Sequence, residues 1–188
     1  GKEINSYGYS AEQRMIFSSI KKNDNFRCGQ LFRILNPSKN ICPIGTNQGE
    51  KNILLLGNSH ADSIKIPLSQ TINNENSNLF MHISNRVLID KQYNYQKLIH
   101  DIKSNQIESV IIHFSPSFYS SEKRLKELEK MVIELKKVSI PFVFISPVPV
   151  FKFNVPRQLY LETISQDEAL DMVDVKEYEQ SIFGFREF

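Results

Sequence analysis

Short apolar runs alternate along this chain with longer segments in which apolar residues recur every three or four positions. Residues 53–56 read Ile-Leu-Leu-Leu and residues 110–112 read Val-Ile-Ile, which is typical of strands buried on both faces of a parallel sheet. Between residues 121 and 137 the apolar positions follow helical spacing, and Glu and Lys fill most of the others. This last pattern predicts an amphipathic helix with a solvated, charged face.

The same patterns predict strands and helices in alternation. Strands are predicted at Lys51–Leu56, Leu79–Ser84, Ser109–Phe114 and Pro141–Ser146. Helices are predicted at residues 10–22, Ser59–Gln70, Tyr93–Ser104 and Ser121–Lys137, with one or two more within Asp167–Ile182. Pro67 is expected to interrupt or kink its helix, because proline has no N–H to donate. We expect residues 23–50 to be irregular and Asn73–Asn78 to form a polar turn.

This alternation predicts an open, mostly parallel α/β sheet with helices on both faces. We expect a single domain over residues 1–188, in which residues 1–50 supply a helix and a loop before an α/β core at 51–188. Ligands of such sheets bind beyond the carboxyl ends of the strands. The positions that follow the predicted strands are therefore the candidates for function: Gly57–Asp62, Asn85–Arg86, Ser115–Ser121 and Pro147–Phe153.

Composition and charge narrow the class of protein. The chain has 188 residues, of which 40% are hydrophobic and 23% are charged, as in ordinary globular proteins. Its apolar runs are too short to span a bilayer. The formal net charge of +2 does not call for a nucleic acid or an anionic surface as partner.

The segment that follows the first predicted strand carries the clearest chemical signal. Gly57 permits a tight turn, and Ser59 follows at the start of the next predicted helix. The first N–H groups of a helix are unpaired and can stabilise an oxyanion beside an exposed hydroxyl. Two interpretations stay open from these residues alone: Ser59 is a nucleophile, or it only caps the helix.

Cys28 and Cys42 lie in the stretch predicted to be irregular. They are either two unrelated buried thiols or a disulfide that closes a surface loop. A disulfide closing a loop of this size stabilises the fold by about 3 kcal/mol in the chain-entropy model. It also implies an oxidising compartment.

The segment after the first strand resembles the first motif of the SGNH (GDSL-like) hydrolases. More narrowly, it resembles the SGNH domain fused to bacterial membrane acyltransferases of the acyltransferase-3 type. The matching residues are Gly57, Asn58, Ser59, His60 and Ala61, preceded by Cys28 and Cys42. The family usually has Asp where this chain has Asn58. The resemblance implies a three-layer α/β/α, flavodoxin-like fold, and we expect its last strand to be missing from this chain.

The later motifs of the family are altered here. Its second motif centres on a glycine, but no glycine lies between Gly57 and Gly184, so Asn85 is the candidate replacement. Its third motif supplies an Asn, where this chain has Ser115 and Ser117. The oxyanion donors implied by the resemblance are therefore Ser59, Asn85 and Ser117.

The fourth motif of the family, Asp-x-x-His, is absent, since no histidine follows His113. Three explanations stay open: the chain stops before that motif, the domain is a pseudoenzyme, or the base comes from elsewhere. None of the four histidines is expected to be that base. They are His60, His82, His100 and His113.

The resemblance implies that the complete protein transfers an acyl group, most often acetyl, to a cell-surface glycan through a Ser59 acyl-enzyme. By the same resemblance, its expected partners are a glycan acceptor and an acyl donor, and a membrane domain N-terminal to this chain would deliver the acyl group. The domain is expected to lie on the periplasmic or extracellular face of a bacterial membrane. No cofactor, metal or nucleic acid is expected. The alternatives are a carbohydrate esterase and a non-catalytic glycan-binding module.

Two groups of side chains outside the motif have a structural and a functional interpretation. The aromatic residues after the third and fourth strands either pack over the sheet edge or stack on a sugar ring; they are Phe118, Tyr119, Phe151 and Phe153. Three acidic residues at helical spacing are expected to form a solvated face rather than a metal site; they are Asp167, Asp171 and Asp174.

Overall fold

The chain divides into two compact units, and everything argued below lies in the second. The first comprises residues 1–24 and 149–178, and the second comprises residues 25–148 and 179–188. The computed structural model describes residues 10, 28–37, 39–45, 48–86, 88, 94–149 and 175–188.

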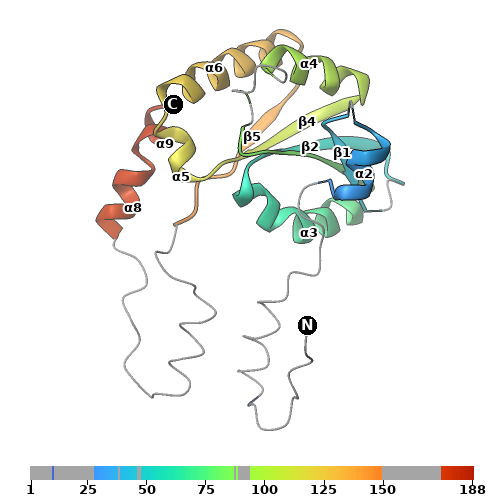
Figure 1. The fold of residues 1–188 in the computed structure, drawn as a ribbon, viewed down its shortest axis with the longest axis horizontal. Helices are drawn as coiled ribbons and strands as arrows, with labels where there is room; N and C mark the ends of the chain where they lie inside the picture. The colour runs from blue at the N-terminus through green and yellow to red at the C-terminus, as the bar shows by residue number, and fades with distance from the viewer. Residues whose placement is uncertain are drawn as a thin grey trace. The chain divides into compact units, whose positions relative to one another are not determined.

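A five-stranded sheet of order β1-β3-β2-β4-β5 forms the centre of the second unit (Figure 1). Its strands are β1 (Cys42–Ile44), β2 (Lys51–Gly57), β3 (Ser77–Ile83), β4 (Ile107–His113) and β5 (Phe142–Phe144). β2 pairs in parallel with both β3 and β4, and β4 pairs in parallel with β5. β1 pairs antiparallel with β3. The predicted fold, a mostly parallel sheet between helices, is confirmed.

Helices cover both faces of this sheet. α3 (Ser59–Asn74) lies on one face, and α4 (Tyr95–Ser104) and α6 (Glu122–Lys137) lie on the other (Figure 1). The side chains of β2 alternate between them, because successive residues of a strand point to opposite faces. Leu54 and Leu56 pack in the cluster that α4 and α6 complete, and Leu55 packs in the cluster of α3 and β1.

Four shorter helices complete the described elements. They are α2 (Gln30–Leu35), α5 (Pro116–Tyr119), α8 (Val175–Ser181) and α9 (Phe183–Glu187). α9 packs against α5, where a Cβ on Gly184 would lie 2.4 Å from the carbonyl oxygen of Tyr119. The ring of Phe185 meets that of Tyr119 edge to face, with centroids 5.1 Å apart. These contacts fix the segment that follows β4.

The structure corrects the expectation that residues 23–50 are irregular, because they contain α2 and β1. β1 has only three residues, and its partner β3 is distant in sequence, so no local sequence pattern predicts β1. α2 leaves Leu31, Ile34 and Leu35 exposed, so it lacks the buried apolar stripe by which helices are recognised.

The turn expected at Asn73–Asn78 is shorter than predicted. α3 is not interrupted at Pro67 and continues past Gln70 to Asn74, and β3 begins at Ser77. Of the helix expected over residues 10–22, only Ser10 lies within the described residues. Of the segment Asp167–Ile182, the described part contains α8.

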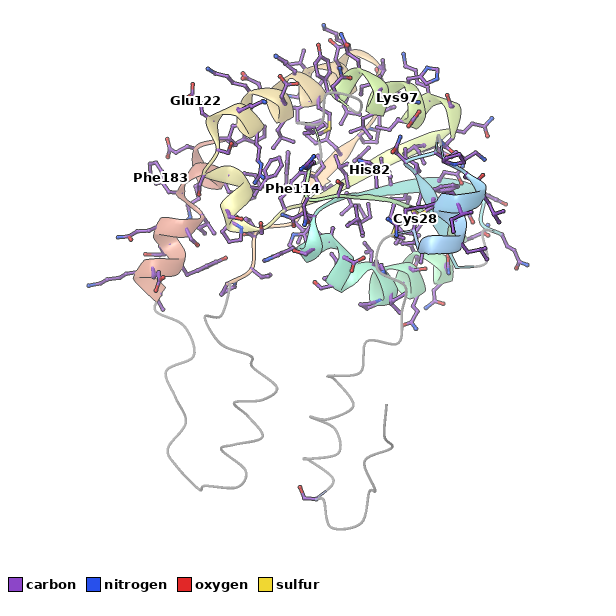
Figure 2. The ribbon with its side chains drawn as sticks, in the orientation of Figure 1. Cys28, His82, Lys97, Phe114, Glu122 and Phe183 are labelled. Atoms are coloured by element: carbon purple, nitrogen blue, oxygen red, sulfur yellow. A yellow bond between two sulfur atoms is a disulfide. The ribbon has the colours of Figure 1, made fainter. Side chains whose placement is uncertain are left out.

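Of the two alternatives that the sequence left open for Cys28 and Cys42, the structure has the disulfide. Cys42 is the first residue of β1, and Cys28 precedes α2 (labelled in Figure 2). The bond therefore ties the chain before α2 to the edge of the sheet.

Candidate active site

The carboxyl ends of β2 and β4 lie side by side at the point where the chain changes direction across the sheet. From β2 the chain passes through α3 to β3, and from β3 it crosses through α4 to β4 on the other side of β2. Open α/β sheets bind ligands at such a switch point. The residues that immediately follow β2 and β4 are therefore the ones to consider.

Gly57 is the last residue of β2 and has no room for a side chain. It pairs with Ile83 of β3 and with His113 of β4. A Cβ built on it would lie 2.0 Å from the carbonyl oxygen of His113 and 2.5 Å from the Cβ of Ala61. Glycine is required here because both β4 and the first turn of α3 approach the backbone closely.

Asn58 links the ends of the two strands. It caps α3, since its Oδ1 accepts a hydrogen bond from the backbone N–H of His60 at 3.1 Å. The same oxygen accepts from the N–H of Ser115 at 3.2 Å, and Nδ2 donates to Ser115 Oγ at 2.8 Å. One side chain thus holds the start of α3 against the chain that leaves β4.

Ser59 is the first residue of α3 and is exposed. No hydrogen bond joins its Oγ to any other residue of the described ranges. The capping role that the sequence allowed for Ser59 belongs to Asn58 instead. The hydroxyl of Ser59 therefore stands free at a helix N-terminus, where unpaired N–H groups and the helix dipole favour negative charge.

Ser115 and Ser117 follow β4. Ser115 is buried, Ser117 is exposed, and their Oγ atoms lie 3.0 Å apart. Asn58, Ser115 and Ser117 consequently form one hydrogen-bonded chain that runs from the residue before Ser59 to the surface. Sequence reasoning named Ser115 and Ser117 but missed their link to Asn58, because it joins residues 57 positions apart.

Two histidines, from the first turn of α3 and from the end of β4, contact each other. The rings of His60 and His113 lie edge to face, with centroids 5.9 Å apart. Burial lowers the pKa of His60, and the charge of His113 lowers it further. Burial also lowers the pKa of His113, although its hydrogen-bond contact with the carbonyl oxygen of Ile145, at 3.3 Å, opposes that shift. Both pKa shifts favour the neutral form of the imidazole. Sequence reasoning considered each histidine alone and did not find the pair.

The other predicted positions lie apart from this arrangement. Asn85 is exposed in the turn after β3, and its side chain has no hydrogen bond to another described residue. His82 is buried within β3, where its Nδ1 lies 2.8 Å from the carbonyl oxygen of Asn40 (Figure 2). His100 is exposed on α4.

Phe118 and Tyr119 are buried, and their rings pack with Phe114 (labelled in Figure 2) and Phe185 rather than facing outward. In the part of the chain that the structure describes, no group of three or more His, Cys, Asp or Glu side chains is placed to hold a metal ion. The remaining residues weighed for sugar or metal contacts lie outside the described ranges: Phe151, Phe153, Asp167, Asp171 and Asp174.

The family model for the "SGNH domain (fused to AT3 domains)" matches residues 27–187. The chain belongs to this family. This SGNH domain thus has the fold that the first motif implied, and its family implies activity of the serine hydrolase or acyltransferase type. The fusion to AT3 domains in the family suggests a membrane acyltransferase domain as its partner.

Searches of the curated proteins and of the solved structures found no match. Among the helices of the described residues, none combines the length and the hydrophobicity needed to cross a membrane.

Proposed function

We propose that this SGNH domain transfers an acyl group, most simply acetyl, to a hydroxyl of a cell-surface glycan through an ester on Ser59. The observation that carries the proposal is the exposed Ser59 hydroxyl at the N-terminus of α3, beside the chain Asn58–Ser115–Ser117. A membrane domain of the AT3 type, N-terminal to this chain, would deliver the acyl group. The disulfide supports a site of action on the extracytoplasmic face, where oxidising conditions preserve it.

The chemistry has two steps. Ser59 Oγ attacks the acyl carbonyl carbon, its proton passes to a base, and the leaving group of the acyl donor departs with that proton, which leaves an acyl ester on Ser59. A glycan hydroxyl then attacks that ester and gives its proton to the base, which passes it to Ser59 Oγ as Ser59 is released. In both steps the carbonyl oxygen becomes negative, and the backbone N–H of Ser59 would donate to it.

The base is the one part that the described residues do not supply at Ser59. No imidazole or carboxylate within them is hydrogen-bonded to its hydroxyl, and no histidine follows His113 in the sequence. A serine without a base is a weak nucleophile. We infer that the base comes from residues outside the described ranges or outside this chain.

The experiment that tests the proposal is labelling with a fluorophosphonate probe, which forms a covalent adduct with activated serines, read by intact mass. Imidazole added in excess supplies a base from solution. We expect one adduct on this chain with imidazole present, and none on Ser59→Ala. Ser63→Ala is the matched control, because Ser63 is also exposed and lies one turn further along α3. Absence of any adduct on the folded protein, with imidazole present, contradicts the proposal.

A non-catalytic glycan-binding role is the second candidate, and one observation favours it: the sequence has no histidine after His113. That role predicts glycan binding that Ser59→Ala leaves unchanged, with no adduct under any condition. A carbohydrate esterase shares the Ser59 ester and is distinguished by its second step. When Ser59 is acetylated by an activated acetyl ester and an oligosaccharide is then added, transfer yields acetylated sugar, whereas an esterase yields free acetic acid.

A further inference from the structure

We propose that Asn58 sets the direction of the hydrogen-bonded chain through Ser115, so that the hydroxyl proton of Ser117 points outward as a donor to the oxyanion formed at Ser59. This inference rests on the proposed function, because it gives Ser117 a role only if Ser59 carries the acyl group. It makes Ser117 a catalytic residue and Asn58 a positioning residue.

The orientation of the Asn58 amide is fixed by its partners. Two backbone N–H groups, those of His60 and Ser115, point at one end of the side chain. An N–H can only donate, so that end is the carbonyl oxygen. The other end is therefore the NH2 group, and it donates to Ser115 Oγ at 2.8 Å.

The direction of the next bond follows from the burial of Ser115. Its Oγ already accepts from Asn58, so its own proton needs an acceptor. Ser117 Oγ, at 3.0 Å, is the acceptor that the described residues provide. The opposite direction would leave a buried hydroxyl proton unpaired, because Ser115 is only 8% exposed. Leaving a buried donor unpaired costs more free energy than the hydrogen bond itself provides.

The series of hydrogen bonds from Asn58 through Ser115 ends at the surface with the hydroxyl of Ser117, which is free to donate its proton. Ser117 Oγ accepts from Ser115, and no other described residue takes its proton. Ser117 is exposed, so its O–H is open to water or to a ligand. It follows β4 as Ser59 follows β2, and the Asn58–Ser115 bonds join these two strand ends. A carbonyl oxygen held over Ser59 would therefore meet a donor from the β4 side.

The chemistry of the side chain at position 58 decides this direction. A carboxylate can accept from both backbone N–H groups and cap α3 as well as an amide does. It has no proton to donate, so Ser115 would donate to it and would in turn accept from Ser117. Asn58→Asp is thus expected to keep the helix cap and to reverse the direction of the two side-chain hydrogen bonds. The hydroxyl proton of Ser117 would then point toward Ser115.

A double-mutant cycle on the rate of fluorophosphonate labelling, with imidazole present, tests this. In the wild-type chain, Ser117→Ala is expected to slow labelling of Ser59 at least about tenfold, since one oxyanion donor is lost. In the Asn58→Asp background the same substitution is expected to change the rate by less than about threefold, because the donor is already absent. Ser117→Thr, which keeps a hydroxyl, is expected to restore the rate, and the exposed Ser120→Ala is the matched control.

Neutron diffraction from deuterated crystals reads the direction without any reaction. We expect the deuteron of Ser115 to lie toward Ser117 and that of Ser117 to lie away from Ser115. A Ser117 deuteron on the line to Ser115 overturns the inference.

The kinetic outcomes separate the two proposals. If wild type takes no label, the proposed function fails and Ser117 loses its role with it. If Ser59→Ala alone abolishes labelling while Ser117→Ala reacts at the wild-type rate, only the inference about Ser117 and Asn58 is wrong. An equal effect of Ser117→Ala in both backgrounds shows that Asn58 does not set the direction.

Discussion

Gly57 touches two other parts of the fold at once, the last residue of β4 and the first turn of α3. Its missing Cβ lets Asn58 reach the N–H and the hydroxyl of Ser115. The hydrogen bonds of the candidate site therefore depend on a residue that has no side chain of its own.

Gly57→Ala is expected to lower the free energy of unfolding by more than about 2 kcal/mol, because the new methyl group overlaps backbone that cannot move independently. Urea denaturation followed by circular dichroism measures this. Gly57→Ala/Ala61→Gly removes the contact with Ala61 but keeps the one with His113 O. We expect the double variant to stay destabilised, and recovery of wild-type stability would show that the approach of β4 is not what excludes the methyl group.

The sequence allowed Gly57 and Ser59 to be singled out because their signal is local: a strand, a glycine and a serine before a helix. The hydrogen-bond partners of Asn58 could not be predicted from the sequence. A hydrogen bond between Asn58 and Ser115 depends on which strands become neighbours, and strand order is set by the packing of helices on both faces. The contact between His60 and His113 was not predicted for the same reason.

At the scale of elements, three helices end in the same way. α3, α4 and α6 are each followed, one residue after the C-cap, by a residue with a left-handed backbone: Asn76, Gln106 and Ser139, with φ of 52°, 53° and 56°. Glycine is the usual residue at this position, because a Cβ is strained there. The chain accepts that strain at these three tight helix-to-strand turns of the described residues.

Gln106→Gly is expected to raise the free energy of unfolding by up to about 1 kcal/mol, because the backbone strain is relieved and the exposed side chain is not missed. Gln70→Gly is the matched control, since Gln70 is exposed inside α3 and glycine there costs about 1 kcal/mol. Thermal melting of both variants gives the comparison. A loss of stability in both would mean that position 106 gains nothing from glycine.

The elements that were predicted well are those whose pattern is local and long. α6 carries a regular apolar stripe, and β2 and β4 are apolar runs buried between two layers of helices. β1 and α2 were not predicted. A three-residue edge strand has no such pattern, and neither has a six-residue helix with exposed apolar side chains. Helix and strand ends shifted by a few residues, as at Asn74 and Ser77, where polar residues continue both elements.

For the molecule as a whole, the partly buried imidazole of His60 and the buried imidazole of His113 make the free energy of unfolding depend on pH. In the unfolded chain each group titrates near its ordinary pKa of 6.5, while the fold lowers both values. Well above pH 6.5 both histidines are neutral in the folded and in the unfolded chain. As the pH falls below 6.5, the unfolded chain binds protons first, so the folded state loses stability until the lowered pKa values are passed.

We expect the free energy of unfolding to be smaller at about pH 5 than at about pH 7.5, and His113→Gln to reduce that difference, because one proton-linked group is removed. Urea titrations at both values measure it. His100→Gln, at an exposed position of α4, is the matched control for the loss of an imidazole. If His113→Gln keeps the full wild-type difference, the pH dependence has another source.

The short strand β1 has a consequence for how separate copies of this protein meet. An open strand edge offers unpaired N–H and C=O groups to any other strand, and exposed edges of this kind drive aggregation. β1 occupies one edge of β3, and the disulfide between Cys42 and Cys28 holds it there. Reduction would thus uncover a ready site for strand-to-strand association. Chains made in a reducing compartment are accordingly expected to associate through β3 more readily than oxidised chains, in which β1 covers that strand.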